Sequence, residues 1–138
     1  MKTGMAIDEL RSVPILAGLS EAGYERISRS SAEVEASPGQ VLALPGDAAS
    51  GAFIVLDGTV VVELRGRSIE LGPGSVVGEL ALLVPDTGRV ARVRASSQAR
   101  CLSLPREDFL ALVESEPSFA LALLRELAAR LVDVHTTA

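Results

Sequence analysis

Short apolar runs separated by turn residues fill the middle of the chain, over residues 33–105. The runs are rich in valine, and Pro-Gly, Asp-Gly, Arg-Gly and Gly-Pro-Gly sequences divide them at short intervals. Short β-branched runs bounded by Gly and Pro are typical of strands, so the pattern predicts a small all-β roll or barrel. Among the turn signals, Asp57-Gly58 stands between the apolar runs 53–56 and 59–62, which predicts a hairpin at this point.

Helical patterns flank the predicted β-roll on both sides. Before it, apolar positions thin into a polar segment in which Ser20 is suited to cap a helix, and we predict two short helices joined near residues 14–20. After residue 105 no glycine occurs, and residues 106–114 and 117–134 carry helical patterns. Pro117 falls in the first turn of the second helix, where its missing N–H has no cost.

These elements predict a mainly β fold with flanking helices, organised as one domain over residues 1–138. Its centre is a double-stranded β-roll of the jelly-roll type. We expect the N-terminal helices over 1–32, the roll over 33–105 and two closing helices over 106–138.

The last predicted helix has an apolar face that covers about half of its circumference, wider than the ~100° that one packing surface needs. The helix is therefore either sunk deep into its own domain or shared with a second subunit as a homodimer contact. The main stripe of this face consists of Ala120, Leu123, Leu124, Leu127, Leu131 and Val134, and Leu121, Ala128 and Val132 flank it. On the polar arc, Glu126 and Arg130 have the i,i+4 spacing of an ordinary surface pair.

Composition narrows the classes of function. The chain has 138 residues, 48% of them apolar, with 13 basic and 18 acidic side chains and a formal net charge of −5. Nonspecific binding to nucleic acid is largely driven by cations, so we expect neither a DNA partner nor a DNA-binding element after the last helix. No apolar stretch reaches the ~20 residues that span a bilayer. We therefore expect a cytoplasmic protein without a membrane partner.

The single cysteine, Cys101, and the single histidine, His135, limit the chemistry further. One cysteine forbids an internal disulfide, and the two residues together supply too few ligands for a metal centre, an iron–sulfur cluster or a haem. Nucleophilic catalysis lacks its usual partners as well. We expect no cofactor and no enzyme activity.

The candidate chemistry lies between residues 76 and 95. Strand alternation places Arg89 on the same face as Val93, and Arg92 and Arg94 on the opposite face. An arginine keeps its proton, so one that faces a barrel interior needs an anion, and its planar fork suits a phosphate or a carboxylate. Glu79 is one candidate partner, and in that case the pair is only structural.

Gly78 opens the segment 78–83, which is typical of a short helical turn whose free N–H groups form an anion cradle. Glycine lets a ligand approach the backbone closely, and Glu79 can accept a hydrogen bond from a sugar hydroxyl. Arg89 can neutralise a phosphate.

Segments 78–83 and 89–91 together resemble the phosphate-binding cassette of the cyclic nucleotide-binding domain family. That family includes the domains of the catabolite activator protein and of the regulatory subunits of cyclic-AMP-dependent kinase. The resemblance extends along nearly the whole chain, through segments 13–20, 36–42, 45–47 and 53–58 and the paired closing helices, and it places the cassette at 77–91.

The resemblance implies a role for each cassette residue. Gly78 offers its backbone N–H to the ligand, and Glu79 holds the ribose 2′-hydroxyl. The backbone of Leu80 and Ala81 completes the cradle, and Arg89 binds the cyclic phosphate.

Other positions refine the implied ligand. Val90 stands where a hydroxyl residue often accompanies preference for cyclic GMP, so the resemblance favours cyclic AMP, with cyclic GMP as the alternative. Counting from Pro117 places Val134 where the catabolite activator protein has a threonine that contacts adenine, and the alignment leaves open that Arg130 faces the pocket. The separation between Glu79 and Arg89 is one residue longer than the commonest spacing in the family.

Two hypotheses of different classes follow. The first is a noncatalytic sensor that binds a cyclic purine mononucleotide in the roll and moves its closing helices in response. The second is an interaction module of the same fold that dimerises through residues 117–134 without binding nucleotide.

Overall fold

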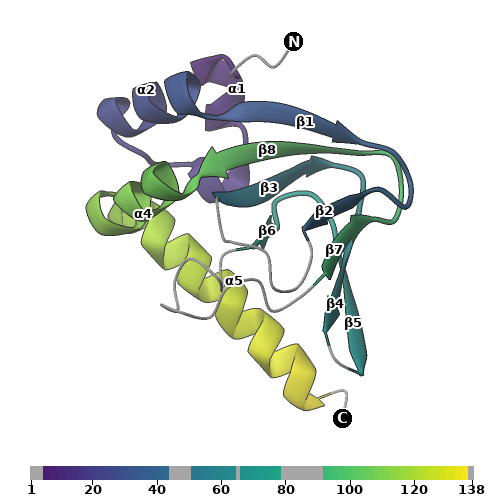
Figure 1. The fold of residues 1–138 in the computed structure, drawn as a ribbon. Coiled ribbons are helices and arrows are strands. Elements are labelled where there is room, and N and C mark those ends of the chain that lie inside the picture. Colours follow the sequence, from purple (N-terminus) through teal and green to yellow (C-terminus); the bar gives the residue numbers. More distant parts are fainter. Residues whose placement is uncertain (1–4, 44–50, 65, 79–91, 137–138) are drawn as a thin grey trace.

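The computed structural model describes residues 5–43, 51–64, 66–78 and 92–136, and Figure 1 shows their arrangement. The segments at the two ends of the chain are helical. They are α1 (Ile7–Arg11), the 3-10 helix η1 (Pro14–Leu16), α2 (Glu21–Ser30), α4 (Arg106–Ser115) and α5 (Pro117–Thr136). The strands are β1 (Ala32–Ala36), β2 (Val41–Ala43), β3 (Gly51–Asp57), β4 (Val60–Leu64), β5 (Arg67–Leu71), β6 (Val76–Val77), β7 (Arg92–Ala95) and β8 (Ala99–Pro105).

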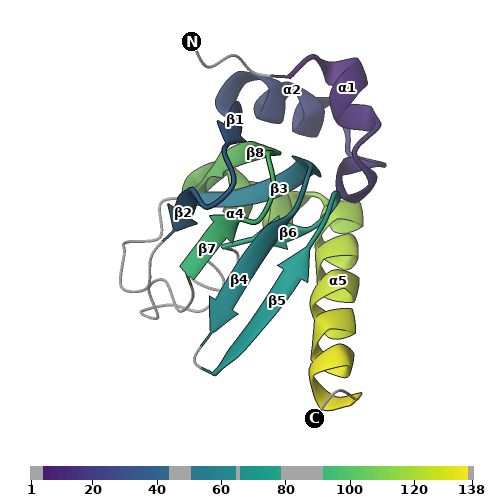
Figure 2. The same ribbon diagram turned by 90° about the vertical axis from the view of Figure 1, so that its right-hand side faces the viewer.

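The strands form two antiparallel sheets, one with the order β1-β8-β3-β6 and one with the order β2-β7-β4-β5. The α1–α2 segment and α4 lie over the first sheet, and α5 runs along one side of the roll (Figures 1 and 2). The predicted fold class, a mainly β roll with flanking helices, is confirmed.

The first sheet is covered on both faces, which explains why residues 53–56 of β3 form a continuous apolar run rather than an alternating one. One face of β3 presents Ala52 and Ile54 to the helices, and the other presents Val55 to the second sheet. The core therefore has two parts, one between the helices and the first sheet and one between the two sheets.

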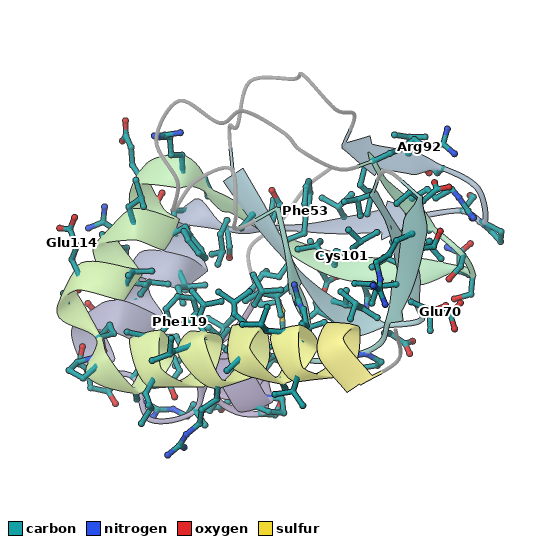
Figure 3. All side chains as sticks on the ribbon, turned by 90° about the horizontal axis from the view of Figure 1, so that it is seen from below. Phe53, Glu70, Arg92, Cys101, Glu114 and Phe119 are labelled. Atoms are coloured by element: carbon teal, nitrogen blue, oxygen red, sulfur yellow. The ribbon has the colours of Figure 1, made fainter. Side chains whose placement is uncertain are left out.

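The part between the sheets is the interior of the roll. Cys101 of β8 is fully buried there, and burial raises the pKa of its thiol to about 11. Phe53 lies at the edge of this interior, as the side-chain view in Figure 3 shows. The other buried members are Ala36, Val55, Val60, Val77, Val93, Ala95 and Ala99.

The hairpin predicted at Asp57-Gly58 is wrong. β3 and β4 belong to different sheets, and β4 instead forms its hairpin with β5, where Val60 pairs with Leu71. Gly58 has a φ of +78° and lies so close to the 96–98 turn that a Cβ would come within 2.2 Å of the Gln98 carbonyl oxygen. The Asp-Gly sequence thus serves a corner at which the chain crosses from one sheet to the other.

The junction between α4 and α5 is tied to the start of α2. Glu116, extended because proline follows it, is 7% exposed. Its carboxylate accepts hydrogen bonds from the backbone N–H of Ser20 at 2.8 Å and from the Ser20 hydroxyl at 2.6 Å. The same hydroxyl accepts from the Gly23 N–H at 3.1 Å, which confirms Ser20 as the N-cap of α2.

The apolar face predicted for α5 is only partly correct. Leu123 is buried, and Phe119 packs edge-on against Phe109 of α4 with ring centroids 5.8 Å apart. Leu124 and Leu131, assigned to the main stripe, are 63% and 60% exposed. The helix is therefore not sunk deep into its own domain. Its inward stripe follows positions 119, 123, 126 and 130, because these lie one above the other at alternating spacings of four and three residues.

Candidate functional site

The described part of the predicted cassette begins where β6 ends. Val76 and Val77 of β6 are buried, and Gly78 directly after them has a φ of +85°. That left-handed conformation is easy for glycine and costly for other residues. The backbone thus turns sharply out of the first sheet at the position where the sequence predicts the start of the phosphate cradle. Glu79, Leu80, Ala81, Arg89 and Val90 lie outside the described residues.

Strand β7 resumes the chain beyond the cassette on the second sheet. Val93 and Ala95 point into the roll and are buried, whereas Arg92 and Arg94 point outward. This alternation confirms the prediction for residues 92–95. Arg89 precedes Val93 by about two strand repeats, and its placement on the inward face stays a prediction.

The two outward arginines share one carboxylate. Glu63 of β4 accepts from Arg92 Nε at 2.8 Å and from Arg94 Nε at 3.0 Å. The hydrogen bond from Arg92 is the main reason why the pKa of Glu63 is lowered, and Arg94 adds to it. Figure 3 shows Arg92 on the outside of the roll. Both arginines are therefore paired with Glu63 on the outer surface, and neither of them faces the roll interior.

The described lining of the roll interior is apolar. Its buried hydrophobic members carry no charge, and four half-buried side chains pack against them: Leu42, Phe53, Val62 and Leu71. Among the residues described, no cluster of His, Cys, Asp and Glu could hold a metal ion. An interior of this kind offers shape and apolar contact to a flat ring.

Helix α5 contacts β6 through the side chains of Glu126 and Arg130. The Glu126 carboxylate accepts from the Val76 N–H at 3.0 Å, and the Arg130 guanidinium donates to the Val76 carbonyl. The two side chains also pair with each other at 2.6 Å and are 20% and 19% exposed. The prediction of an ordinary surface pair is thus wrong. Val134 belongs to α5, but its side chain is outside what the structure describes.

Sequence reasoning missed the contact of Glu126 with β6, although one signal was present. Positions 119, 123, 126 and 130 form a single stripe, so the acid and the base continue the line of the buried Phe119 and Leu123. A helical wheel aligned on the buried Phe119 places Glu126 and Arg130 on the face of α5 that points toward the domain. A groove of about 440 Å³ runs beside this face, between α5, η1 and the 73–75 turn.

Comparison with known families agrees with this geometry. The model of the cyclic nucleotide-binding domain matches residues 33–116, which is more than half of the chain. The match covers every strand of the roll after β1 has begun, the cassette segment and α4. This chain belongs to the cyclic nucleotide-binding domain family.

Individual relatives share the domain within longer proteins. A cyclic nucleotide-gated potassium channel of Rhizobium etli is 32% identical over 109 residues, which cover 79% of this chain and 30% of the channel. The cAMP-binding acyltransferase from Mycobacterium smegmatis superposes with a TM-score of 0.79 at 26% identity, over 92% of this chain and 41% of that chain. The chain thus spans less than half the length of either relative.

For a third relative, the match covers nearly the whole length of the relative's chain. It is a solved structure from work on a cyclic-GMP-dependent signalling pathway that regulates bacterial phytopathogenesis. The TM-score is 0.64 at 31% identity, over 83% of this chain and 95% of that chain. Within the described residues, no helix is both long and apolar enough to cross a membrane.

Proposed function

We propose that this chain is a noncatalytic sensor module that binds a cyclic purine mononucleotide in the roll and relays its occupancy through α5. The observation that carries the proposal is the family match over residues 33–116, which includes the cassette segment. The left-handed backbone of Gly78 supports it, because a cradle of N–H groups needs such a turn at its start.

In this proposal each polar part of the ligand has its own partner. Gly78, with the backbone of Leu80 and Ala81, donates N–H groups to the cyclic phosphate, and Arg89 neutralises its charge. Glu79 accepts from the ribose 2′-hydroxyl. The purine lies against the apolar interior of the roll, and its outer edge faces α5.

Cyclic AMP is the proposed ligand rather than cyclic GMP. Val90 offers no hydroxyl beside the phosphate, and on α5 Val134 and Arg130 are the proposed contacts toward the base. The relative linked to cyclic GMP makes a direct comparison of the two nucleotides essential. Calorimetric titration of the chain with each of them tests the preference. Tighter binding of cyclic GMP would contradict it.

The decisive experiment replaces the proposed phosphate partner. Removing one member of a desolvated charge pair costs about 3 to 5 kcal/mol, so Arg89→Ala should weaken cyclic AMP binding by about two to three and a half decades. Arg89→Lys should restore only part of the affinity, because an ammonium lacks the planar fork. Arg92→Ala, on the outer face of β7, is the matched control and should leave affinity within about threefold of wild type.

Two outcomes contradict the proposal. One is a wild-type chain that binds neither nucleotide. The other is a folded Arg89→Ala chain whose affinity changes less than threefold.

A homodimer through α5 is a second candidate function, and the outward stripe of that helix favours it. Leu121, Leu124 and Leu131 are 46%, 63% and 60% exposed, and with Ala128 they repeat at spacings of three and four residues. Apolar residues at that spacing form the seam of paired helices. We expect sedimentation to show a dimer that Leu124→Glu dissociates. A wild-type monomer at high concentration would exclude this contact.

A further inference from the structure

The outer edge of β6 is closed by a helix. β6 is the last strand in its sheet and pairs only with β3 among the described strands, where Val76 faces Ile54. On either side of Val76 the chain pairs with β3. Before it, the Val55 N–H donates to the Ser75 carbonyl and the Gly74 N–H donates to the Val55 carbonyl, each at 2.8 Å, and after it Val77 pairs with Phe53. In an antiparallel ladder the next residue turns its N–H and C=O away from the partner strand. Both polar groups of Val76 therefore face outward.

Glu126 and Arg130 bind both of these groups, and we call the two side chains the clip. The Glu126 carboxylate accepts from the Val76 N–H at 3.0 and 3.3 Å to its two oxygens. Arg130 donates to the Val76 carbonyl and, at 2.6 Å, to Glu126. Glu126 supplies an acceptor for the Val76 N–H, and Arg130, one helical turn later, supplies a donor for the Val76 carbonyl.

The clip attaches the middle of α5 to the roll. Near its start the helix is held by Ser118, whose hydroxyl donates to the Gly18 carbonyl at 3.0 Å, and by the buried Phe119. The half-buried Leu127 packs against the core, whereas Leu131 and Val132 are 60% and 59% exposed. Between Leu127 and Val132 the helix therefore buries little apolar surface, and the bond of Arg130 to the Val76 carbonyl is a contact that holds this part of it.

We propose that Glu126 and Arg130 are positioning residues that fasten α5 to the strand leading into Gly78. Because Gly78 follows Val76 by two residues, a shift of the cassette backbone that extends to Val76 must either carry α5 with it or break the clip. The clip thereby couples the position of the helix to the position of the cassette, in both directions. The link to nucleotide rests on the proposed function, whereas the clip itself does not.

A simpler role would be to satisfy the exposed edge of β6 without holding the helix, because buried backbone groups need partners. The two roles differ in what happens to α5 when the clip is removed. If the clip only closes the strand edge, its loss affects Val76 alone. If it positions the helix, the amides of α5 beyond Leu127 lose protection as well.

Amide hydrogen exchange, followed by NMR on the chain without added nucleotide, separates these roles. In Glu126→Ala we expect the amides of Val76 and of residues 128–132 to exchange about tenfold faster than in wild type, or more. Arg125→Ala is the matched control, since Arg125 is exposed on the same helix and bonds to no described residue. The proposal is overturned if Val76 alone responds, or if the control changes residues 128–132 as much as Glu126→Ala does.

An exchange of the two charges tests whether the ion pair or its bonds to the backbone do the holding. Glu126→Arg combined with Arg130→Glu keeps opposite charges at i,i+4 but places a donor opposite the Val76 N–H and an acceptor opposite its carbonyl. We expect this double variant to exchange as fast as Glu126→Ala. Wild-type protection would show that the ion pair alone suffices and would overturn the clip. Arg130→Lys, which keeps a donor, should retain part of the protection.

Adding cyclic AMP at saturating concentration then examines the coupling. In wild type, exchange should change at Gly78 and at residues 128–132 together, and in Glu126→Ala the change should remain at Gly78 but be lost from the helix. A helix that still responds without the clip contradicts the coupling. A failure of cyclic AMP to bind contradicts the proposed function instead, and the clip is then judged on the nucleotide-free exchange alone.

Discussion

Glu116 provides a strong test of how the closing helices are held, because its buried carboxylate joins segments almost a hundred residues apart. It accepts two hydrogen bonds from Ser20, at 2.8 and 2.6 Å, and is 7% exposed. Glu116→Ala removes the acceptor for both and leaves the Ser20 N–H without its partner. Hydrogen bonds to a charged group contribute about 1.5–3 kcal/mol each, and part of that is recovered because no carboxylate remains to be desolvated.

We therefore expect Glu116→Ala to lower the free energy of unfolding by about 2–4 kcal/mol. For a domain of this size that corresponds to a fall in Tm of roughly 8–16 °C. Glu116→Gln keeps the shape and one acceptor, so its loss should be about half as large. Thermal unfolding followed by circular dichroism measures all three chains.

The matched control is Glu114→Ala, two residues earlier, where Figure 3 shows the side chain pointing away from the molecule. It removes the same charge from the last turn of α4, and an exposed substitution of this kind changes stability by about 0.5 kcal/mol or less. A Tm for Glu116→Ala within 2 °C of this control would refute the assignment of Glu116 as the anchor of the junction.

Two further outcomes are expected, one from backbone geometry and one from charge. Gly58→Ala should lower the free energy of unfolding, measured with denaturant, by about 3 kcal/mol or more, because it adds a clash with Gln98 to the left-handed strain. Gly66→Ala, at φ +73° with open space around it, should lower it by only about 1 kcal/mol. Equal losses in the two variants would contradict this reasoning. The carboxyl of Glu63 should titrate by NMR below its ordinary pKa and return toward it in Arg92→Ala. Its stabilising effect is present above the unfolded pKa and is lost as the pH falls through the lower folded value, so a midpoint at or above the ordinary pKa would be inconsistent.

The fold class could be predicted because its signals are local. Strand length, turn residues and helix caps are written in neighbouring positions, and Ser20 and Pro117 fall where the structure begins α2 and α5. The same locality explains the error at Asp57-Gly58. A tight turn between two apolar runs looks alike whether the strands pair with each other or separate into two sheets. Only the contact of Gly58 with Gln98, forty residues away, decides between them.

The candidate site shows the same division. The inward direction of Val93 and the outward direction of Arg92 follow from strand alternation alone. The clip could not be predicted in this way, because it binds the backbone of Val76. Backbone N–H and C=O groups are the same at almost every residue, so the sequence does not indicate which of them a side chain will bind. A pair such as Glu126 and Arg130 is identical in sequence to the many i,i+4 pairs that face solvent.

Because Cys101 is buried between the two sheets, the reaction of its thiol with a labelling reagent can report how often the roll opens. A thiol reacts as the thiolate, and with a pKa of about 11 only about one molecule in a thousand carries it at pH 8. The side chain is also fully buried between the two sheets. A thiol reagent can therefore reach sulfur only when the sheets part, and the chain has no second cysteine to obscure the signal. The rate of labelling thus measures how often the roll opens, without any introduced probe.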